Sequence, residues 1–202
     1  MNKRLFDLLT SFFGLLLITP FFLLLMLLVR KTMGSPVFFT QVRPGRHGKP
    51  FNMVKFRSMT NKTDAHGQLL PNEKRMTRLG RFLRSSSLDE LPGLYSVLKG
   101  DMSLVGPRPL LMDYVPYFSD QQKKRHDVRP GITGWAQVNG RNAIDWDTKL
   151  AHDIWYVENQ SFWLDIRILF MTIFKVFKRE GIVHEGTVGM PRFDEYVKNK
   201  SK

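Results

Sequence analysis

Cysteine is absent from the 202 residues of this chain. Its absence excludes a disulfide framework and a metal site built on thiolates, and it fits a reducing compartment. Histidine is scarce, and the five histidines are scattered without a pair at helical ligand spacing, so we interpret them as surface or packed residues. The sequence has no internal repeat and no long linker, which predicts one folded unit and one membrane segment.

Acidic side chains are few in comparison with basic ones. Asp and Glu together number 18 and Lys and Arg number 31, which gives a formal net charge of +13 and a pI of about 10.2. A chain of this charge is expected to have an anionic partner. Nucleic acid, phospholipid headgroups and nucleotide substrates all meet that expectation.

One long stretch near the amino terminus has no charge. Residues 8–29 are nearly all apolar, and a run of 22 residues is long enough to cross a bilayer core of about 30 Å as a helix. A cleaved signal peptide is disfavoured, because the run is too long for a signal core and no small-residue cleavage site follows it. A single membrane span is therefore the simplest interpretation.

Two features favour a re-entrant helix over that span. Lys3-Arg4 precedes the run and Arg30-Lys31 follows it, so the positive-inside preference draws both ends to the cytoplasmic side. Thr19-Pro20 lies in the middle, where proline removes a backbone donor and a threonine hydroxyl can bond the freed carbonyl. We predict a helix that breaks at Thr19 and Pro20 and returns to the same surface, with a kinked span as the alternative.

A β-hairpin is predicted after the apolar segment. Two β-branched and aromatic runs, residues 37–42 and 51–57, flank a segment that is rich in turn residues. Lys55 and Arg57 share one face of the second strand, which could line a site or be an ordinary solvated face. Residues 61–72 then predict a polar loop, and residues 77–84 predict a short basic amphipathic helix.

Two adjacent carboxylates, Asp89 and Glu90, follow Arg84 and precede a short apolar helix. Ser87 and Glu90 fit a capping box, and Asp89 could be the cap instead, so a structural role at a helix start is the ordinary interpretation. Pro107-Arg108 comes soon afterwards, directly behind a glycine. Arginines beside paired carboxylates suit metal-assisted phosphoryl transfer, in which an ionised Asp89 could attack phosphorus and form an acyl phosphate.

The rest of the chain carries fewer signals. Residues 129–141 form a glycine-rich polar stretch that we interpret as a loop. Residues 161–179 predict a helix in which aromatic and apolar residues are interleaved with basic ones. Its uncharged centre is too short to cross a bilayer, so this helix lies either at the membrane interface or in the domain core.

Four motifs make the sequence resemble a known family. They are Ser87-Leu-Asp-Glu-Leu-Pro92, Val97-Leu-Lys-Gly-Asp-Met-Ser103, Val105-Gly-Pro-Arg-Pro109 and Arg129-Pro-Gly-Ile-Thr-Gly-Trp-Ala-Gln-Val-Asn-Gly-Arg141. In these motifs the chain resembles the bacterial sugar transferases, the monotopic phosphoglycosyl transferases, from about Lys3 to Phe177. It is most similar to the small members that contain only the catalytic domain, such as the undecaprenyl phosphate N,N'-diacetylbacillosamine 1-phosphate transferases.

The resemblance implies a two-step reaction. Asp89 would attack the β-phosphate of a UDP-sugar and release UMP, and polyprenol phosphate would then attack the phosphosugar carried by the aspartate. By the same resemblance Asp89 contacts Mg²⁺, and Glu90 assists the metal or the proton transfer. The re-entrant helix of the family usually breaks at Ser-Pro, so Thr19-Pro20 keeps the hydroxyl at that position.

Further site residues follow from the same resemblance. Arg84, Pro107 and Arg108 are expected to hold phosphate. Lys55 and Arg141 are expected to face the nucleotide or the sugar. Together with Asp89 and Glu90 these residues make up the predicted site.

We therefore predict an α+β membrane enzyme. The re-entrant membrane helix takes residues 1–31, the catalytic domain takes residues 32–185, and a polar tail takes residues 186–202. The catalytic domain is expected to contain a small β-hairpin and amphipathic or interfacial helices around a cytoplasm-facing active site. The predicted location is the bacterial inner (cytoplasmic) membrane, in contact with phospholipid.

The predicted reaction transfers a sugar 1-phosphate from a UDP-sugar to undecaprenyl phosphate, the first membrane step of glycoprotein, O-antigen or capsule assembly. A UDP-2-acetamido sugar is the expected donor, with UDP-diacetylbacillosamine as the candidate, and nucleic acid is not an expected partner. The sequence does not predict the oligomeric state. A non-enzymatic basic protein that docks on anionic lipid or nucleic acid is the alternative.

Overall fold

The computed structural model describes residues 2–140, 144–178 and 191–200. It confirms a mixed α and β fold in which helices surround two small sheets. The helices within these ranges are α1 (Lys3–Met33), α2 (Asn72–Arg75), α3 (Arg78–Ser85), α4 (Gly93–Lys99), α5 (Asp120–Lys123), α6 (Trp135–Val138), α7 (Trp146–Glu158), α8 (Phe162–Lys178) and α9 (Phe193–Lys200). The strands are β1 (Phe38–Pro44), β2 (Pro50–Phe56), β3 (Ser103–Val105) and β4 (Gly131–Thr133). Short 3₁₀ turns are η1 (Arg46–Gly48), η2 (Leu88–Glu90), η3 (Met112–Tyr117) and η4 (Lys124–His126).

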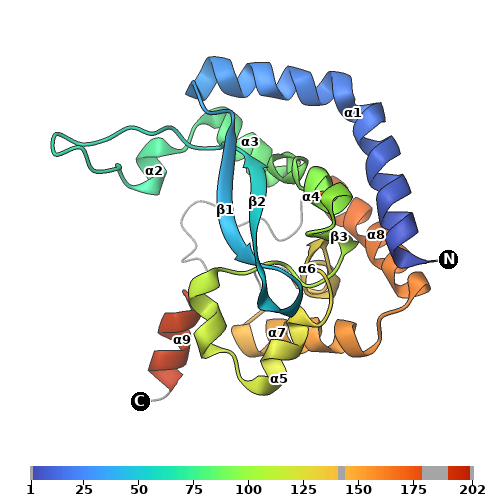
Figure 1. Ribbon diagram of the computed structural model, residues 1–202. Helices are drawn as coiled ribbons and strands as arrows, with labels where there is room; N and C mark the ends of the chain where they lie inside the picture. Colours follow the sequence, from blue (N-terminus) through green and yellow to red (C-terminus); the bar gives the residue numbers. More distant parts are fainter. Residues whose placement is uncertain (1, 141–143, 179–190, 201–202) are drawn as a thin grey trace.

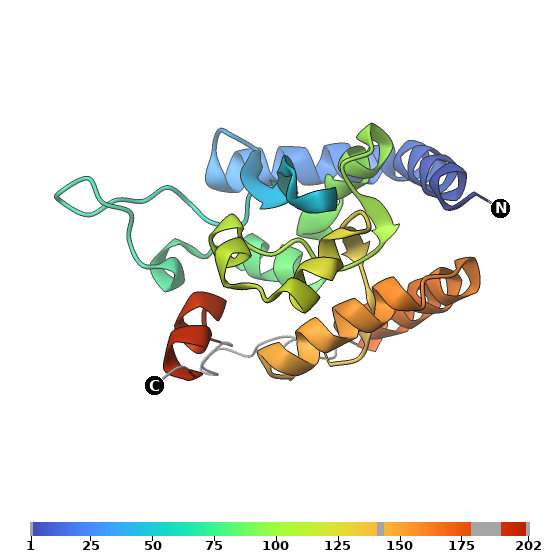
Figure 2. The same cartoon turned by 60° about the horizontal axis from the view of Figure 1, so that its bottom comes forward.

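The elements form three layers. Helix α1 covers one side of the molecule, α7 and α8 lie on the other, and the hairpin, α4 and the β3–β4 sheet lie between them (Figures 1 and 2). A buried apolar cluster connects the middle layer to α7 and α8, and its members are Phe51, Met53, Val97, Met102, Leu104, Val105, Val138, Tyr156 and Ile168. The core therefore lies directly beneath the hairpin.

The hairpin is confirmed. Strands β1 and β2 pair antiparallel, with Thr40 opposite Val54, close to the bounds that the sequence predicts. Strand β3 pairs with β4 in parallel, with Ser103 opposite Gly131. A side chain on Gly131 would meet the backbone nitrogen of Gly106 at 2.1 Å, so only glycine allows the chains to approach this closely.

The interpretation of residues 129–141 as a loop is wrong within the described residues. This segment contains strand β4 and the short helix α6. Strand β4 exists because β3 supplies its hydrogen-bond partners across the fold, and a three-residue strand of this kind has too short a run to show in the sequence pattern.

Helix α1 bends but stays helical throughout. Its assignment runs unbroken from Lys3 to Met33 with Pro20 inside it, and Figure 1 shows it turning midway along its length. The hydroxyl of Thr19 donates to the carbonyl of Leu15 at 2.7 Å. The carbonyl that lacks a donor because of Pro20 is that of Leu16, four residues earlier, so the prediction that the hydroxyl bonds the freed carbonyl is wrong. This is the one helix in the described ranges that is long and apolar enough to cross a membrane, by length and composition, and only 11% of its most apolar window is buried.

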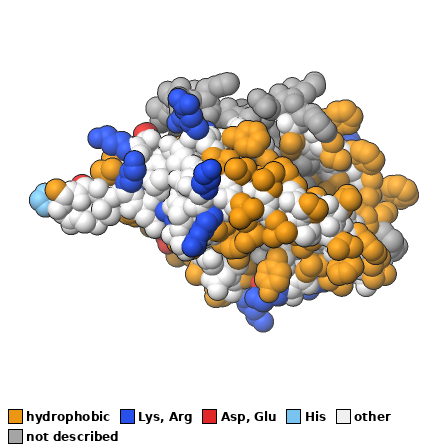
Figure 3. All heavy atoms as spheres, turned by 90° about the horizontal axis from the view of Figure 1, so that it is seen from above, with side chains coloured by type: hydrophobic (Ala, Val, Ile, Leu, Met, Phe, Trp, Pro, Cys, Tyr) orange, Lys and Arg blue, Asp and Glu red, His pale blue; other side chains and the backbone are white. Residues whose placement is uncertain are grey.

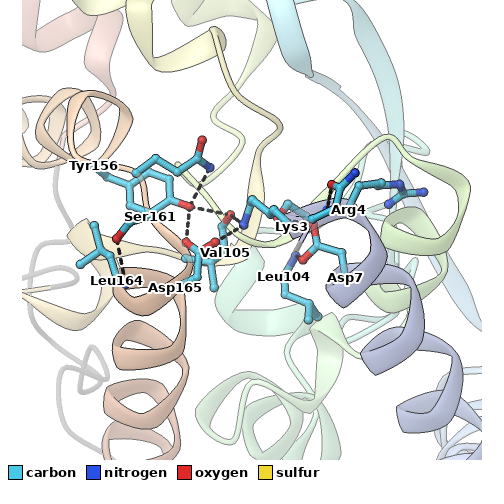
Figure 4. A network of polar contacts seen from close by, with 12 residues as sticks. Lys3, Arg4, Asp7, Leu104, Val105, Tyr156, Ser161, Leu164 and Asp165 are labelled. Carbon is cyan, nitrogen blue, oxygen red and sulfur yellow. Dashed lines mark hydrogen bonds and ion pairs between the residues drawn. The ribbon is translucent and has the colours of Figure 1, made fainter.

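The amino-terminal end of α1 is tied to the domain by ion pairs and hydrogen bonds (Figure 4). The ammonium of Lys3 contacts a carboxylate oxygen of Asp165 on α8 at 2.5 Å and the carbonyl of Val105 at 3.2 Å. Asp7 is buried and accepts from the hydroxyl of Ser103 at 2.8 Å and from the backbone N–H of Leu104 at 3.2 Å. These contacts fix the start of the helix to strand β3.

The carboxyl-terminal end of α1 docks on the same domain. Leu25, Val29 and Met33 are buried in a cluster with Phe56 of β2 and Leu83 of α3. A straight helix of this length would hold its ends about 45 Å apart. The bend instead brings both ends against one domain and leaves the middle of α1 exposed.

The apolar side chains of α1 that remain exposed form a continuous surface. They include Phe12, Phe13, Leu16, Leu17 and Leu27, with Leu17 82% exposed. Figure 3 views the molecule from this side and shows hydrophobic side chains gathered over α1, with Lys and Arg side chains along one flank. An exposed apolar area of this extent marks a surface for lipid or protein.

Helices α8 and α9 complete the domain. In α8, Ile168 and Asp165 are buried while Phe170 and Phe174 are more than half exposed, so this helix belongs to the core and also presents an apolar outer face. Within residues 186–202, α9 packs Phe193 into a second buried cluster, which is formed with Tyr114, Phe118, Trp146 and other residues. The described part of the predicted tail is therefore folded against the domain.

Candidate functional site

A cleft of about 790 Å³ opens beside the hairpin. Its walls come from β1, β2, the loop before α2, helix α3 and turn η2, and they include the predicted residues Lys55, Arg84, Asp89, Glu90 and Arg108. This volume is within the range of about 300–1,000 Å³ that is typical of small-molecule sites. Five of the seven residues predicted for the site thus share one cavity.

Turn η2 carries the two carboxylates between α3 and α4, and the capping interpretation is wrong. Ser87 has a left-handed backbone with φ of 58° and makes no capping hydrogen bond, and α4 begins only after Pro92. Glu90 directs its carboxylate to cations in the cleft instead of back to the Ser87 N–H. The left-handed residue turns the chain so that both acids face the cleft.

Glu90 is fixed between two cations. Its Oε1 atom accepts from Lys55 Nζ at 2.7 Å and from an Arg108 nitrogen at 2.5 Å, and its Oε2 atom accepts from the other Arg108 nitrogen at 3.1 Å. Burial alone would raise the pKa of Glu90, but Arg108 and Lys55 lower it to about 2. Glu90 is therefore ionised at neutral pH, and its two oxygens are both engaged.

Asp89 has a different environment from its neighbour. The described part of the chain offers its carboxylate no hydrogen bond, and it lines the cleft. Burial and the adjacent Glu90 raise the pKa of Asp89, and Lys55, Arg108 and Arg84 act against that rise. The carboxylate of Asp89 is thus the one in this pair that is available to a ligand.

Lys55 and Arg57 both line the cleft, but the ion pair with Glu90 is made by Lys55. The Lys55 side chain is 19% exposed and pairs with Glu90, so the interpretation as a solvated face is wrong for this residue. Burial and the charge of Arg108 lower the pKa of Lys55. Arg57 is buried and donates to the carbonyls of Ser35 and Met59, which gives it a structural role where the chain leaves β2.

The remaining predicted residues have separate locations. Arg84 lines the cleft and donates from Nε to the hydroxyl of Ser58 at 2.9 Å. Pro107 lies outside the cleft lining, and its carbonyl accepts from the Gly131 N–H at 3.0 Å. Arg141 lies outside the described residues. Thr19 and Pro20 are on α1, away from the cleft.

Two further arginines of the cleft are not evident from the sequence. Arg43 on β1 and Arg75 at the end of α2 both line the cleft, and the Nε atom of each is buried without a hydrogen-bond partner among the described residues. Arg43 could have been found from strand alternation, because Phe39, Gln41 and Arg43 share one face of β1 and Phe39 pairs with Lys55. For Arg75 the sequence carries no comparable signal.

A buried ion pair supports the site from behind. Arg125 is 2% exposed, contacts a carboxylate oxygen of Asp153 at 2.7 Å and also donates to the backbone carbonyl of Arg108 at 2.7 Å. Burial raises the pKa of Asp153, and the charge of Arg125 opposes that rise. The pair therefore holds the main chain that carries the Arg108 guanidinium.

The donor set is compatible with Mg²⁺ held jointly with a substrate. Mg²⁺ is commonly bound by one or two carboxylates together with substrate phosphates, and Asp89 supplies one carboxylate that faces the cleft. Across the described ranges no group of three acidic or histidine side chains could hold a metal without a substrate.

The chain matches known proteins over most of its length. The family model described as bacterial sugar transferase matches residues 1–179. The uncharacterized sugar transferase EpsL of Bacillus subtilis is 56% identical over 191 residues, which cover 95% of both chains. The undecaprenyl-phosphate galactose phosphotransferase of Salmonella typhimurium is 42% identical over 196 residues, which cover 89% of this chain and 41% of that protein.

A third relative is named for a different sugar. The UDP-N-acetylgalactosamine-undecaprenyl-phosphate N-acetylgalactosaminephosphotransferase of Aeromonas hydrophila is 41% identical, with 85% of this chain and 42% of that protein covered. A docking protein without activity would account for the basic charge but not for these identities. The predicted resemblance is thus confirmed, and the chain belongs to the bacterial sugar transferase family as an enzyme of the phosphoglycosyl transferase class.

Proposed function

We propose that this enzyme transfers a sugar 1-phosphate from a UDP-sugar to undecaprenyl phosphate and releases UMP. The observation that carries the proposal is that the carboxylates of two adjacent acidic residues have different contacts. Glu90 is committed to Lys55 and Arg108, while Asp89 faces the cleft without a hydrogen bond from the described residues. Relatives named for transfer to undecaprenyl phosphate support the class of donor and acceptor.

In the first step a carboxylate oxygen of Asp89 attacks the β-phosphorus of the UDP-sugar. The bond from the β-phosphorus to the oxygen that bridges the two phosphates breaks, and UMP leaves with the electron pair. In the second step a phosphate oxygen of undecaprenyl phosphate attacks the same phosphorus. The bond to Asp89 then breaks, so the carboxylate is regenerated and the lipid carries a diphosphate-linked sugar.

The cations of the cleft serve this chemistry. An anionic nucleophile approaches an anionic phosphate only when positive charge offsets the repulsion. Arg43 and Arg75 each have a buried Nε donor without a partner in the part of the chain that the structure describes, and Arg84 lines the same cleft, so a diphosphate would satisfy donors that are already positioned. Mg²⁺, held by Asp89 and the phosphates of the donor, would neutralise further charge.

Membrane attachment is proposed from α1. Both of its ends contact one domain, and the exposed apolar middle suits a helix that enters one leaflet and returns. Lys3-Arg4 and Arg30-Lys31 at the two ends favour the cytoplasmic side. This arrangement would hold the cleft at the depth of the lipid phosphates at the bacterial inner membrane.

The sugar is proposed to be a 2-acetamido sugar, with UDP-diacetylbacillosamine as the candidate. This proposal rests on the similarity to the small, catalytic-domain-only members. A panel of UDP-sugars incubated with undecaprenyl phosphate and Mg²⁺, with UMP measured, tests it. A preference for UDP-glucose or UDP-galactose over every 2-acetamido donor would contradict it.

The nucleophile is tested with Asp89→Asn, which keeps the shape and removes the negative charge. UMP release is expected to fall at least about 1,000-fold, and mass spectrometry is expected to find a phosphosugar adduct on Asp89 of the wild type only. Asp120→Asn, on the exposed α5, is the matched control and should keep full activity. Undiminished UMP release by Asp89→Asn would refute the covalent mechanism.

A further inference from the structure

A second, smaller groove reaches the candidate site from another side. It measures about 170 Å³ and lies between η2 and α4 on one wall and β4, α6 and α8 on the other. It shares Ser87, Glu90 and Arg108 with the large cleft. The Glu90–Arg108 ion pair is therefore a common wall of the two spaces.

The two spaces differ in the chemistry of their walls. The large cleft is lined by five basic residues besides Arg108, namely Arg43, Lys55, Arg57, Arg75 and Arg84. The groove is lined instead by apolar side chains that include Leu91, Leu94, Ile132 and Val176. A nucleotide sugar suits the first lining, and a hydrocarbon chain suits the second.

Positive charge is present in the groove at the positions that an anionic headgroup needs. Arg108 lines it together with the large cleft, and Glu90 bonds two of the guanidinium nitrogens, while guanidinium has five N–H donors. The guanidinium of Arg108 therefore has donors beyond the two that Glu90 uses, and these can serve a phosphate. Lys175 on α8 lines the same groove and adds a second cation.

The groove continues into an exposed apolar surface. Val176, which lines the groove, is 40% exposed, and Ile173, which is 52% exposed, lies three residues before it on α8, so the two side chains are neighbours on the helix surface. The groove is smaller than a typical ligand pocket of about 300–1,000 Å³. It has room for a headgroup and the adjoining part of a chain, and the rest of a long chain would lie along α8.

We propose that this groove binds the phosphate and the adjoining isoprenoid units of the acceptor lipid, while the nucleotide sugar uses the large cleft. The inference rests on the proposed function and adds the route by which the acceptor arrives. Its phosphate reaches the phosphorus on Asp89 past Arg108, in line with the bond to Asp89 that breaks, and so from the side that UMP has already left. The nucleoside of the donor and the hydrocarbon chain of the acceptor thus occupy different spaces.

The groove is tested with Val176→Trp, which fills its outer part. Two quantities are measured in detergent: adduct formation on Asp89 with donor alone, and binding of undecaprenyl phosphate by native mass spectrometry. We expect adduct formation within about twofold of wild type, and lipid binding and the KM for undecaprenyl phosphate weakened at least about tenfold. Lys175→Gln, a milder change, should weaken lipid binding about threefold to tenfold with the same unchanged adduct formation.

The matched control is Ala151→Trp, which places the same side chain in a separate groove on α7. It should leave both measurements unchanged. Wild-type lipid affinity in Val176→Trp would overturn the inference, as would an equal loss of adduct formation and lipid binding. If the wild type forms no adduct with any donor, the proposed function fails, while the lipid-binding comparison still decides the groove.

Discussion

At the scale of single residues, the site depends on the different environments of two neighbouring carboxylates. Glu90 meets Lys55 and Arg108 and is held ionised, whereas Asp89 keeps its carboxylate toward the cleft. The sequence predicts the residue types because arginines beside paired acids suit phosphate chemistry. It could not predict which acid is paired with cations, because those cations come from β2 and from the chain after β3.

The same limit explains the residues that were missed. Arg43 and Arg75 reach the cleft only because the hairpin and the chain around α2 fold over η2, and neither forms a motif with Asp89. Arg125 supports Arg108 from behind through a backbone carbonyl, a contact that no spacing rule reveals. Ser87 was misread because a left-handed backbone at a serine is uncommon.

The environment of His126 predicts how the free energy of unfolding depends on pH. It is buried beside Phe118, and burial together with the charge of Arg125 lowers its pKa from 6.5 to about 4. Because this pKa is lower in the folded state, the unfolded state binds more protons between these values. The free energy of unfolding should therefore fall as pH drops from about 6.5 toward 4, by up to about 3 kcal/mol.

The measurement is the thermal unfolding midpoint in detergent between pH 4 and 7. His126→Phe, which cannot take up a proton, should show a shallower decline than the wild type. His66→Phe, in the exposed loop, is the control and should retain the wild-type decline. An identical pH profile in His126→Phe would contradict the prediction.

At the scale of elements, the helices and the hairpin can be predicted where apolar residues recur at helical or strand spacing along the chain. The hairpin shows alternation and turn residues, and α3 has an apolar face with Thr77 as its cap. Strand β4 and helix α6 were missed because each is too short to show a period and depends on partners elsewhere in the fold. In α9 the packing of Phe193 could not be predicted, because a single aromatic residue in a polar segment forms no apolar pattern.

The anchor between α1 and α8 yields a prediction at this scale. Lys3 pairs with Asp165, whose side chain is 3% exposed and also accepts from the hydroxyl of Tyr156 at 2.6 Å. Lys3→Met removes a partner from a buried carboxylate and should cost about 1–3 kcal/mol of unfolding free energy. Asp165→Asn should cost a similar amount.

A double-mutant cycle in detergent measures the pair. The two losses should not add, because each variant breaks the same interaction, and a coupling energy of at least about 1 kcal/mol is expected. Lys123→Met, at the exposed pair with Asp120, serves as control and should change stability by less than about 0.5 kcal/mol. Additive losses at Lys3 and Asp165 would contradict the role of this contact.

At the scale of the whole molecule, α1 makes a prediction about topology. The chain has no cysteine, so single cysteines can be introduced without a background. Cysteines that replace Asn2 and Thr32 should both react with a membrane-impermeant reagent from the cytoplasmic side, and a cysteine at Leu17 should be protected. Labelling of Asn2→Cys and Thr32→Cys from opposite sides would establish a simple span.

The two anchored ends of α1 have a consequence for how the protein responds to its bilayer. A helix that crosses both leaflets must match the full hydrocarbon thickness, and it tilts or distorts the lipid when the match is poor. Here Lys3 and Met33 are both bound to one domain, and in the proposed re-entrant arrangement only the near leaflet would surround the helix. Turnover in vesicles should therefore change little as acyl chains lengthen, in contrast to a protein subject to hydrophobic mismatch.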